Sequence, residues 1–299
     1  MPRGSDAGAR SSLAPKSLRP GLDRRRVLAG LVAGVPLSGG FLAYMVSGAF
    51  AAAKPVTLAP RLSRPIAAAG QIGVLVFELE SGEIGVSDAA RAEQGFLPAS
   101  TFKIPNTLIA LETGVADSLD APVFHWDGKE RGFSGKPVAA WNRDQALRDA
   151  FRNSAVWVYQ DVARHIGPER MQQFVDRLQY GNRDIAGAAI DRFWLAGNLR
   201  ISALEQIRFL DALRAKRLAV SERAQTLVHE VMEIERTAKY VLCGKTGWAD
   251  QIELGWFVGW IESVKGSRLF ALNIDMTNAA SAKSRVEIVK AAARDLNHI

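Results

Sequence analysis

Strand-like segments of this chain lie near its two ends, and this distribution restricts the folds that it can adopt. An almost continuously apolar run at 71–79 precedes the turn signal Ser81-Gly82 and a short strand candidate at 83–86. Three consecutive strand candidates return near the C-terminus, at 239–245, 254–262 and 268–276. We therefore predict one α/β (α+β type) domain, in which segments from both ends of the chain form a single sheet.

Helical periodicity dominates the intervening block. Ser202-Ala203-Leu204-Glu205 and Pro168-Glu169 have the composition of helix starts. The predicted helices of the block are 143–153, 154–166, 168–178, 202–215 and 221–234, and a last amphipathic helix is predicted at 284–296. We expect a single domain over 54–299, with sheet segments at about 64–120 and 236–299 and an inserted all-helical subdomain at about 121–235.

The first 53 residues have the pattern of an export signal. Asp23-Arg24-Arg25-Arg26 precedes the uncharged stretch 27–53, which ends in Ala51-Ala52-Ala53. A basic segment, an apolar segment and an Ala-x-Ala end are typical of a cleaved signal peptide, and the paired arginines favour the twin-arginine type. An uncleaved inner-membrane anchor is the alternative, because the apolar run exceeds the roughly 20 residues of a membrane span. Both interpretations predict a periplasmic domain, without a stable membrane partner if the signal is cleaved.

The charge distribution argues against a nucleic-acid partner. The net charge is +7, but residues 1–53 contain seven basic and two acidic residues and so hold +5 of it. Residues 54–299, with 31 basic and 29 acidic residues, are nearly neutral.

Cys243 is the only cysteine, so no internal disulfide can form, and we expect a buried, inert thiol. The four histidines are far apart in sequence, and no metal site is predicted.

Ser100 and Lys103 form the most suggestive local motif, within Pro98-Ala99-Ser100-Thr101-Phe102-Lys103. They are three residues apart at the start of a predicted helix, so their side chains point to the same side. A serine needs a neighbouring base to act as a nucleophile, and a lysine can be that base if apolar surroundings suppress its charge. By itself such a pair is more often a helix-start serine with a solvated lysine, so its meaning depends on the rest of the chain.

Three later segments are candidate partners of this pair. They are Ser154-Ala155-Val156 at a predicted helix start, Tyr180-Gly181-Asn182 in a loop and Lys245-Thr246-Gly247 at the end of an apolar strand. Each has an ordinary explanation by itself, as a helix cap, a turn or a strand end. In this order after Ser100-Thr101-Phe102-Lys103, however, they closely resemble the motifs of the class D (oxacillinase-type) serine β-lactamases.

The resemblance extends over about 70–296. Further matches are Trp141-Asn142-Arg143-Asp144, Asp191-Arg192-Phe193-Trp194-Leu195 and Gly255-Trp256-Phe257-Val258-Gly259-Trp260. It implies the serine β-lactamase/penicillin-binding transpeptidase-like fold, with an antiparallel sheet flanked by helices. It also implies hydrolysis of small-molecule β-lactam antibiotics of the penicillin and oxacillin class, through an acyl-serine intermediate.

The resemblance also implies catalytic roles. Ser100 is the nucleophile, and Lys103 carries CO2 as N6-carboxylysine and acts as general base in both acylation and deacylation. Trp194 holds the carbamate with its indole N–H, which can only donate. Val156 and Leu195 wall this carbamate pocket off from water. Ser154 relays a proton to the leaving lactam nitrogen.

Substrate binding is implied for a second group of residues: Lys245, Thr246, Gly247, Trp248, Arg285 and Tyr180. Lys245 and Thr246 hold the substrate carboxylate, with Arg285 as a second clamp. The backbone N–H groups of Ser100 and Trp248 form the oxyanion hole, and Tyr180 shapes the pocket. No metal is implied and no cofactor except the CO2 or bicarbonate that carbamylates Lys103, and the protein is expected to be a monomer or a homodimer.

Ser-Ala-Val stands where relatives with a Ser-x-x-Lys motif usually carry Ser-Asp-Asn, and its apolar positions favour a carbamylated lysine over a Glu-activated water. The main alternative is a penicillin-binding sensor domain that is acylated without turnover. Sensors normally need several membrane spans, whereas this chain has one apolar segment. A DD-peptidase fits Ser-Ala-Val poorly, and a non-catalytic basic binding protein loses its support once the charges of 1–53 are removed.

Two departures from the family pattern concern substrate range: 129–138 is longer than expected, and the connection from Lys245 to Trp256 is shorter.

Overall fold

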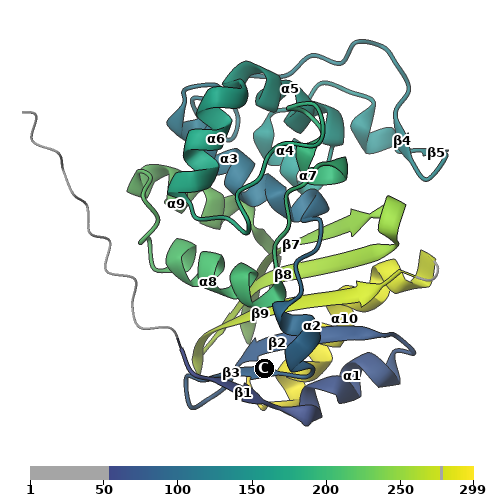
Figure 1. The fold of residues 1–299 in the computed structure, drawn as a ribbon, viewed down its shortest axis with the longest axis vertical. Coiled ribbons are helices and arrows are strands. Elements are labelled where there is room, and N and C mark those ends of the chain that lie inside the picture. Colours follow the sequence, from purple (N-terminus) through teal and green to yellow (C-terminus); the bar gives the residue numbers. More distant parts are fainter. Residues whose placement is uncertain (1–53, 277–278) are drawn as a thin grey trace, which may run out of the picture. The chain divides into compact units, whose positions relative to one another are not determined.

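A computed structural model describes residues 54–276 and 279–299, so the predicted export signal lies outside the described residues. Its centre is a seven-stranded sheet (Figure 1). The strands, in their order across the sheet, are β1 (Val56–Leu58), β3 (Ile84–Val86), β2 (Gly73–Glu78), β9 (Gly266–Asp275), β8 (Leu254–Ser263), β7 (Tyr240–Ala249) and β6 (Glu233–Arg236). All neighbouring pairs are antiparallel except β1 and β3. The pairing of β2 with β9 joins the two ends of the described chain, which confirms the prediction of a single sheet.

The central strands bury both of their faces. Along β2, Val74 and Val76 belong to one apolar core, whereas Leu75 and Phe77 belong to the other. Helices α2 (Ala89–Glu93) and α8 (Ala203–Arg214) pack on the first face, and α1 (Ser63–Ala68) and α10 (Ala279–Asp295) pack on the second (Figure 1). A strand between two helical layers must be apolar on both sides, which explains the almost continuously apolar run at 71–79.

The remaining helices form the block between β3 and β6 (Figure 1). They are α3 (Lys103–Glu112), α4 (Leu147–Arg152), α5 (Val156–Ile166), α6 (Pro168–Arg177), α7 (Phe193–Ala196) and α9 (Glu222–Val231). The predicted start of α8 is confirmed by a capping box, in which Ser202 Oγ accepts from the Glu205 N–H and Glu205 Oε2 accepts from the Ser202 N–H. Within the described residues, no helix combines the length and apolar character needed to cross a membrane.

Two strand features depart from the predicted pattern. The helix predicted at 221–234 ends at Val231, and Glu233–Arg236 instead pairs with β7 as the edge strand β6. These residues alternate between half-buried and exposed, which suits an edge strand. The block predicted to be all-helical also contains a small hairpin, β4 (Gly132–Phe133) and β5 (Lys136–Pro137). Its turn residues, Ser134 and Gly135, both have positive φ, as tight hairpin turns require.

Candidate active site

Ser100 lies in a tight 3-10 turn (Ala99–Phe102) that leads directly into α3. Ala99 has a φ of 48°, a conformation that costs free energy in a residue with a side chain and that is common at functional turns. Lys103 is the first residue of α3, and its Nζ donates to Ser100 Oγ at 2.9 Å. The structure thus brings together the two side chains that the sequence predicts to be nucleophile and base.

Burial controls the chemistry of Lys103. The residue is only 1% exposed, and its Nζ lies 5.2 Å from the centre of the Tyr159 ring. Its pKa lies well below the usual value for lysine, mainly because burial penalises the charged form and additionally because of the positive charge of Lys245. The site therefore favours a neutral amine, which can accept a proton or react with CO2.

Ser154 and Lys245 form a second hydroxyl–amine pair. Ser154 joins α4 to α5 with a φ of 56°, and Lys245 reaches it from the middle of β7. Lys245 Nζ donates to Ser154 Oγ at 3.1 Å and to the Thr246 carbonyl oxygen at 3.1 Å. Burial and then the nearby charge of Arg285 lower the pKa of Lys245 to about 7. A small change in surroundings can therefore change the charge of this amine at neutral pH.

Trp194 lies on α7, against the turn that carries Ser100. Its ring stacks on Phe102, with 5.6 Å between ring centres, and is 1% exposed. The indole N–H has no hydrogen-bond partner among residues 54–276 and 279–299. The N–H group is not one of the completely buried polar atoms that lack a partner, so it can donate to a group that the unmodified chain does not contain.

A cavity of about 650 Å³ lies above these groups. Of the residues predicted for the site, those that line it are Ser100, Ser154, Val156, Leu195, Thr246, Gly247, Trp248 and Arg285. Lys103, Trp194 and Lys245 are buried and do not belong to its lining, although the two lysines are hydrogen-bonded to the serines that do. The wall therefore presents hydroxyls to a ligand, whereas their basic partners are almost completely buried.

Tyr180 is completely buried and does not line the cavity. Its ring packs edge-on against Phe102 and Phe209. Gln206 Nε2 donates to Tyr180 Oη at 3.4 Å and to Thr101 Oγ1 at 3.0 Å, and burial raises the pKa of the phenol. The residue expected to shape the pocket by contact thus supports the Ser100 turn from behind.

Arg285 reaches the cavity from α10 and is held by backbone carbonyl groups. Its Nη1 donates to the carbonyl oxygens of Gly247 and Trp256, and its Nε donates to that of Ala282 at 3.1 Å. Burial lowers the pKa of the guanidinium to about 10, so it remains charged at neutral pH. Its charge is thereby fixed beside β7, where the substrate carboxylate is expected.

Strand β7 passes close to the Ser100 turn at Gly247. A Cβ atom at this position would lie 3.1 Å from the Pro98 carbonyl oxygen and 3.2 Å from Thr101 Cγ2. The glycine of Lys245-Thr246-Gly247 therefore lets the strand and the turn approach each other, and so positions the neighbouring Trp248 relative to Ser100.

Substitution of Gly247 by alanine is expected to lower kcat/KM for benzylpenicillin by about 10-fold, because the added methyl group displaces the strand from the turn by a few tenths of an ångström. The loss should appear mainly in kcat, since the residues that are expected to hold the substrate carboxylate remain. Steady-state kinetics at fixed bicarbonate, with a thermal melt as the control for folding, test this expectation. An unchanged kcat would contradict the close-approach role.

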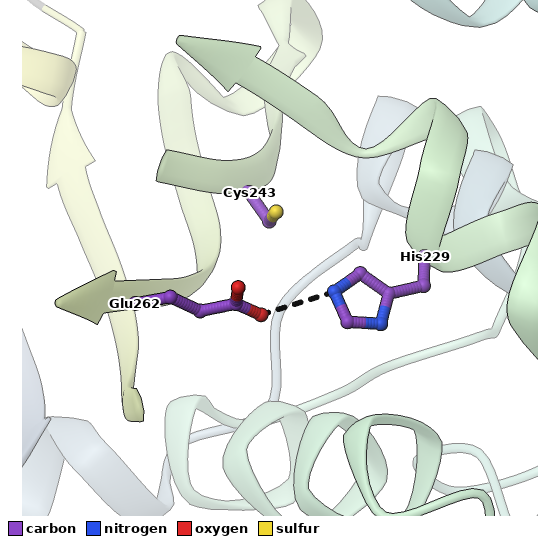
Figure 2. Close-up of side chains that lie close together, drawn as sticks. All are labelled: His229, Cys243 and Glu262. Atoms are coloured by element: carbon purple, nitrogen blue, oxygen red, sulfur yellow. Dashed lines mark hydrogen bonds and ion pairs between the residues drawn. The ribbon is translucent and has the colours of Figure 1, made fainter. Parts of the chain in front are cut away.

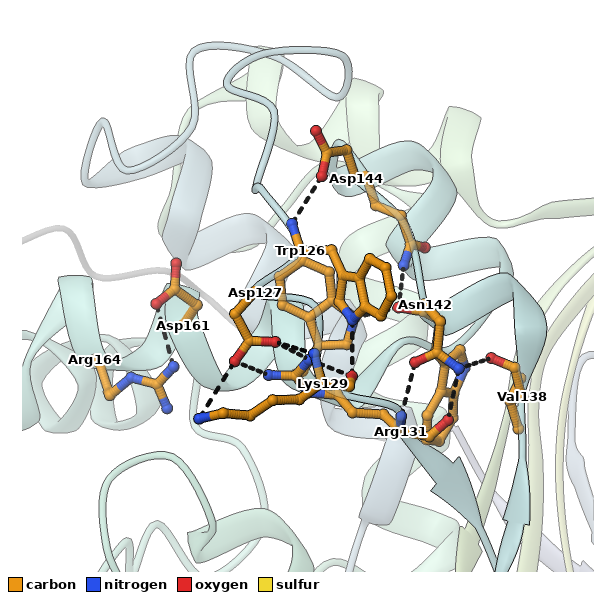
Figure 3. A network of polar contacts seen from close by, with 12 residues as sticks. Trp126, Asp127, Lys129, Arg131, Val138, Asn142, Asp144, Asp161 and Arg164 are labelled. Carbon is orange, nitrogen blue, oxygen red and sulfur yellow. Dashed lines mark hydrogen bonds and ion pairs between the residues drawn. The ribbon is translucent and has the colours of Figure 1, made fainter.

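The β4–β5 hairpin and the adjoining Arg131 form part of the cavity wall, which was not predicted from the sequence. Arg131 and Phe133 line the cavity, and the Phe133 ring lies 4.9 Å from the Trp248 ring. Asp127 holds Arg131 through two hydrogen bonds of 2.6 and 3.0 Å (Figure 3). The guanidinium lies over the ring of Trp157. The signal that could have found this wall is the unexpected length of 129–138, together with the Ser134-Gly135 turn.

Comparisons with known proteins agree with this arrangement. Residues 71–294 match the family described as the penicillin binding protein transpeptidase domain. The chain is 45% identical over 221 residues to β-lactamase OXA-48 of Klebsiella pneumoniae, covering 73% of this chain and 81% of the relative. It is 40% identical over 222 residues to OXA-10 of Pseudomonas aeruginosa, covering 72% and 81% of the two chains. The crystal structure of the class D β-lactamase YbXI from Nostoc is 43% identical, with a TM-score of 0.75 over 80% of this chain and 99% of that one.

Proposed function

Because this chain belongs to the class D serine β-lactamases, we propose that it hydrolyses penicillins and oxacillin-type β-lactams with Lys103, carbamylated by CO2, as the general base. Ser100 is acylated, and the same lysine serves both halves of the reaction. The observation that carries this proposal is the 2.9 Å contact between Lys103 Nζ and Ser100 Oγ inside a site where burial lowers the pKa of the lysine.

The acylation step follows from the positions of the two serines. Carbamylated Lys103 takes the proton of Ser100 as its Oγ attacks the lactam carbonyl carbon, and the backbone N–H groups of Ser100 and Trp248 stabilise the developing oxyanion. Ser154 then donates its proton to the lactam nitrogen as the C–N bond breaks, and Lys245, 3.1 Å from it, replaces that proton. Lys245, Thr246 and Arg285 hold the substrate carboxylate during this step.

Deacylation uses the same base, and a water molecule replaces Ser100 as the group that gives up a proton. Once its first proton has passed to solvent and Lys245 has regained one from solvent, carbamylated Lys103 removes a proton from a water molecule, which attacks the acyl carbon, and this proton passes to Ser100 Oγ as the ester bond breaks. Val156 and Leu195, which line the cavity, limit the water that reaches the lysine. A dry site keeps the amine neutral and therefore able to take up CO2.

The unpaired indole N–H of Trp194 supports a carbamate at Lys103, since a buried anion needs hydrogen-bond donors. Substitution of Trp194 by phenylalanine is expected to lower activity at ambient CO2 by about 10- to 100-fold, because one charge-assisted hydrogen bond is lost. Added bicarbonate should restore much of this loss. Trp141, whose indole N–H already donates to the Asn153 carbonyl oxygen, provides the control: a Trp141→Phe variant should show no bicarbonate rescue.

Turnover distinguishes the proposed enzyme from a penicillin-binding sensor. The purified protein with a chromogenic cephalosporin or oxacillin, in bicarbonate buffer, should hydrolyse many equivalents of substrate. A burst of one equivalent followed by a stable acyl-protein would instead support the sensor.

Export and assembly complete the proposal. We propose that residues 1–53 direct the protein to the periplasm, most simply through a cleaved twin-arginine signal, and that the domain acts there as a monomer or homodimer on small-molecule substrates. N-terminal sequencing of protein from the periplasmic fraction tests cleavage after Ala51 or Ala53. Recovery of the uncut chain from the inner membrane would favour the anchor.

A further inference from the structure

Three side chains with metal-binding groups converge outside the active-site cavity (Figure 2). His229 comes from α9, Cys243 from β7 and Glu262 from β8. Their ligand atoms, an imidazole nitrogen, the thiol sulfur and a carboxylate oxygen, all lie within 4.8 Å of one another. The spacing of these residues in the sequence does not suggest such a cluster, because three separate elements contribute to it.

The sheet register and one tryptophan hold the cluster in place. Cys243 lies opposite Trp260 in the β7–β8 pair, and Glu262 is two residues further along the same face. The Trp260 indole N–H donates to Glu262 Oε1 at 2.9 Å, and the His229 ring stands edge-on to Trp260, 4.7 Å between centres. His229 Nε2 and Glu262 Oε1 are already 3.1 Å apart. Two of the three groups are therefore oriented by an outer contact, as metal ligands usually are.

The cluster is polar on one side and buried on the other. The side chains of His229 and Glu262 are 36% and 38% exposed, which gives an ion and a water molecule access. Cys243 is 2% exposed, and its sulfur has no hydrogen-bond partner in the described part of the chain. Glu233, the neighbour of Cys243 across the β6–β7 pair, is already paired with Arg236, so Glu262 is the carboxylate that supplies negative charge near the thiol. A divalent cation would be attracted to this charge and would give the sulfur a partner.

We propose that His229, Cys243 and Glu262 bind one zinc-class divalent cation within a single chain, with water as the fourth ligand. One nitrogen, one sulfur and one oxygen suit Zn²⁺, which binds such atoms at about 2.0–2.3 Å in a tetrahedron. Ligand atoms of that tetrahedron are about 3.3–3.7 Å apart, so the sulfur has to move by about 1 Å, within reach of a side-chain rotation. The thiol loses its proton to solvent as the sulfur–metal bond forms. The ion would join α9 to β7 and β8.

Cobalt titration of the full chain tests the site, because Cys243 is the only cysteine and residues 1–53 contain neither cysteine nor histidine. Wild-type protein should bind one Co²⁺ per chain and show a thiolate-to-cobalt charge-transfer band. Cys243→Ser should abolish the band, and His229→Ala should weaken binding by at least about 10-fold. Saturating Zn²⁺ should raise the Tm of wild type by about 5–10 °C but not that of His229→Ala.

His165→Ala is the matched control, because His165 also lies beside an acid on a helix, 3.6 Å from Asp161, without a cysteine partner. It should bind Co²⁺ as wild type does. Absence of the charge-transfer band in wild type, or equal weakening by His165→Ala and His229→Ala, would overturn the site. A stoichiometry of one ion per two chains would overturn it too, since the ion would then bridge chains.

Discussion

Substitution of Lys103 by alanine is expected to lower kcat/KM for benzylpenicillin by about 10³- to 10⁴-fold, the contribution typical of a well-placed general base. The Nζ of this lysine is 2.9 Å from Ser100 Oγ, and within the described residues no carboxylate lies among the hydrogen-bond partners of that hydroxyl. Both acylation and deacylation should therefore suffer, and any acyl-enzyme that forms should persist. Stopped-flow kinetics and intact-protein mass spectrometry measure the two steps separately.

Lys290→Ala serves as the control for loss of a half-buried lysine, since Lys290 pairs with Glu235 away from the cavity. It should keep wild-type kinetics. The Tm of Lys103→Ala should stay within a few degrees of wild type, because removal of a buried amine offsets part of the packing loss. Rapid deacylation in Lys103→Ala would show that another base acts in the second step.

Substitution of Lys245 by alanine is expected to lower kcat/KM by about 10²- to 10³-fold, because in the proposed mechanism this one residue both holds the substrate carboxylate and returns a proton to Ser154, to which its Nζ donates. Most of the binding loss should appear in KM. A penicillin analogue without the carboxylate should lose much less, which separates the two roles. Equal losses for both substrates would assign Lys245 to proton transfer alone.

The pH dependence gives a second measurement of the same residue. Burial and then the charge of Arg285 lower the pKa of Lys245 to about 7. A lowered lysine pKa means that the charged form is present below this value and is lost as the pH rises through it. The kcat/KM of wild type, measured at saturating bicarbonate, should therefore decline above about pH 7. Persistence of this decline in Lys245→Ala would assign it to another group.

The sequence predicts the parts of this protein whose signals are local. The run at 71–79 and the strands near 240–275 are apolar because they lie between two helical layers, and the start of α8 carries its own cap. The Ser100–Lys103 pair follows from helical spacing alone. These features depend on residues that are close in sequence, so the local sequence pattern is enough to predict them.

Contacts between distant segments were harder to predict. Glu233–Arg236 continues a helical pattern in sequence, but pairing with β7 makes it a strand. Tyr180 was expected to shape the pocket, yet packing against Phe102 and Phe209 buries it behind the Ser100 turn. The cluster of His229, Cys243 and Glu262 depends on sheet register and helix packing together. In each example the deciding interaction is tertiary.

Dependence of turnover on dissolved CO2 tests the role of Lys103 most directly. Protein transferred into CO2-free buffer should lose most of its steady-state activity and regain it when bicarbonate is added. With ¹³C-labelled bicarbonate, wild type should show one carbamate carbon signal by NMR, and Lys103→Ala should show none. Activity that is indifferent to the removal and return of CO2, with no carbamate signal in wild type, would contradict a carbamylated lysine as the base.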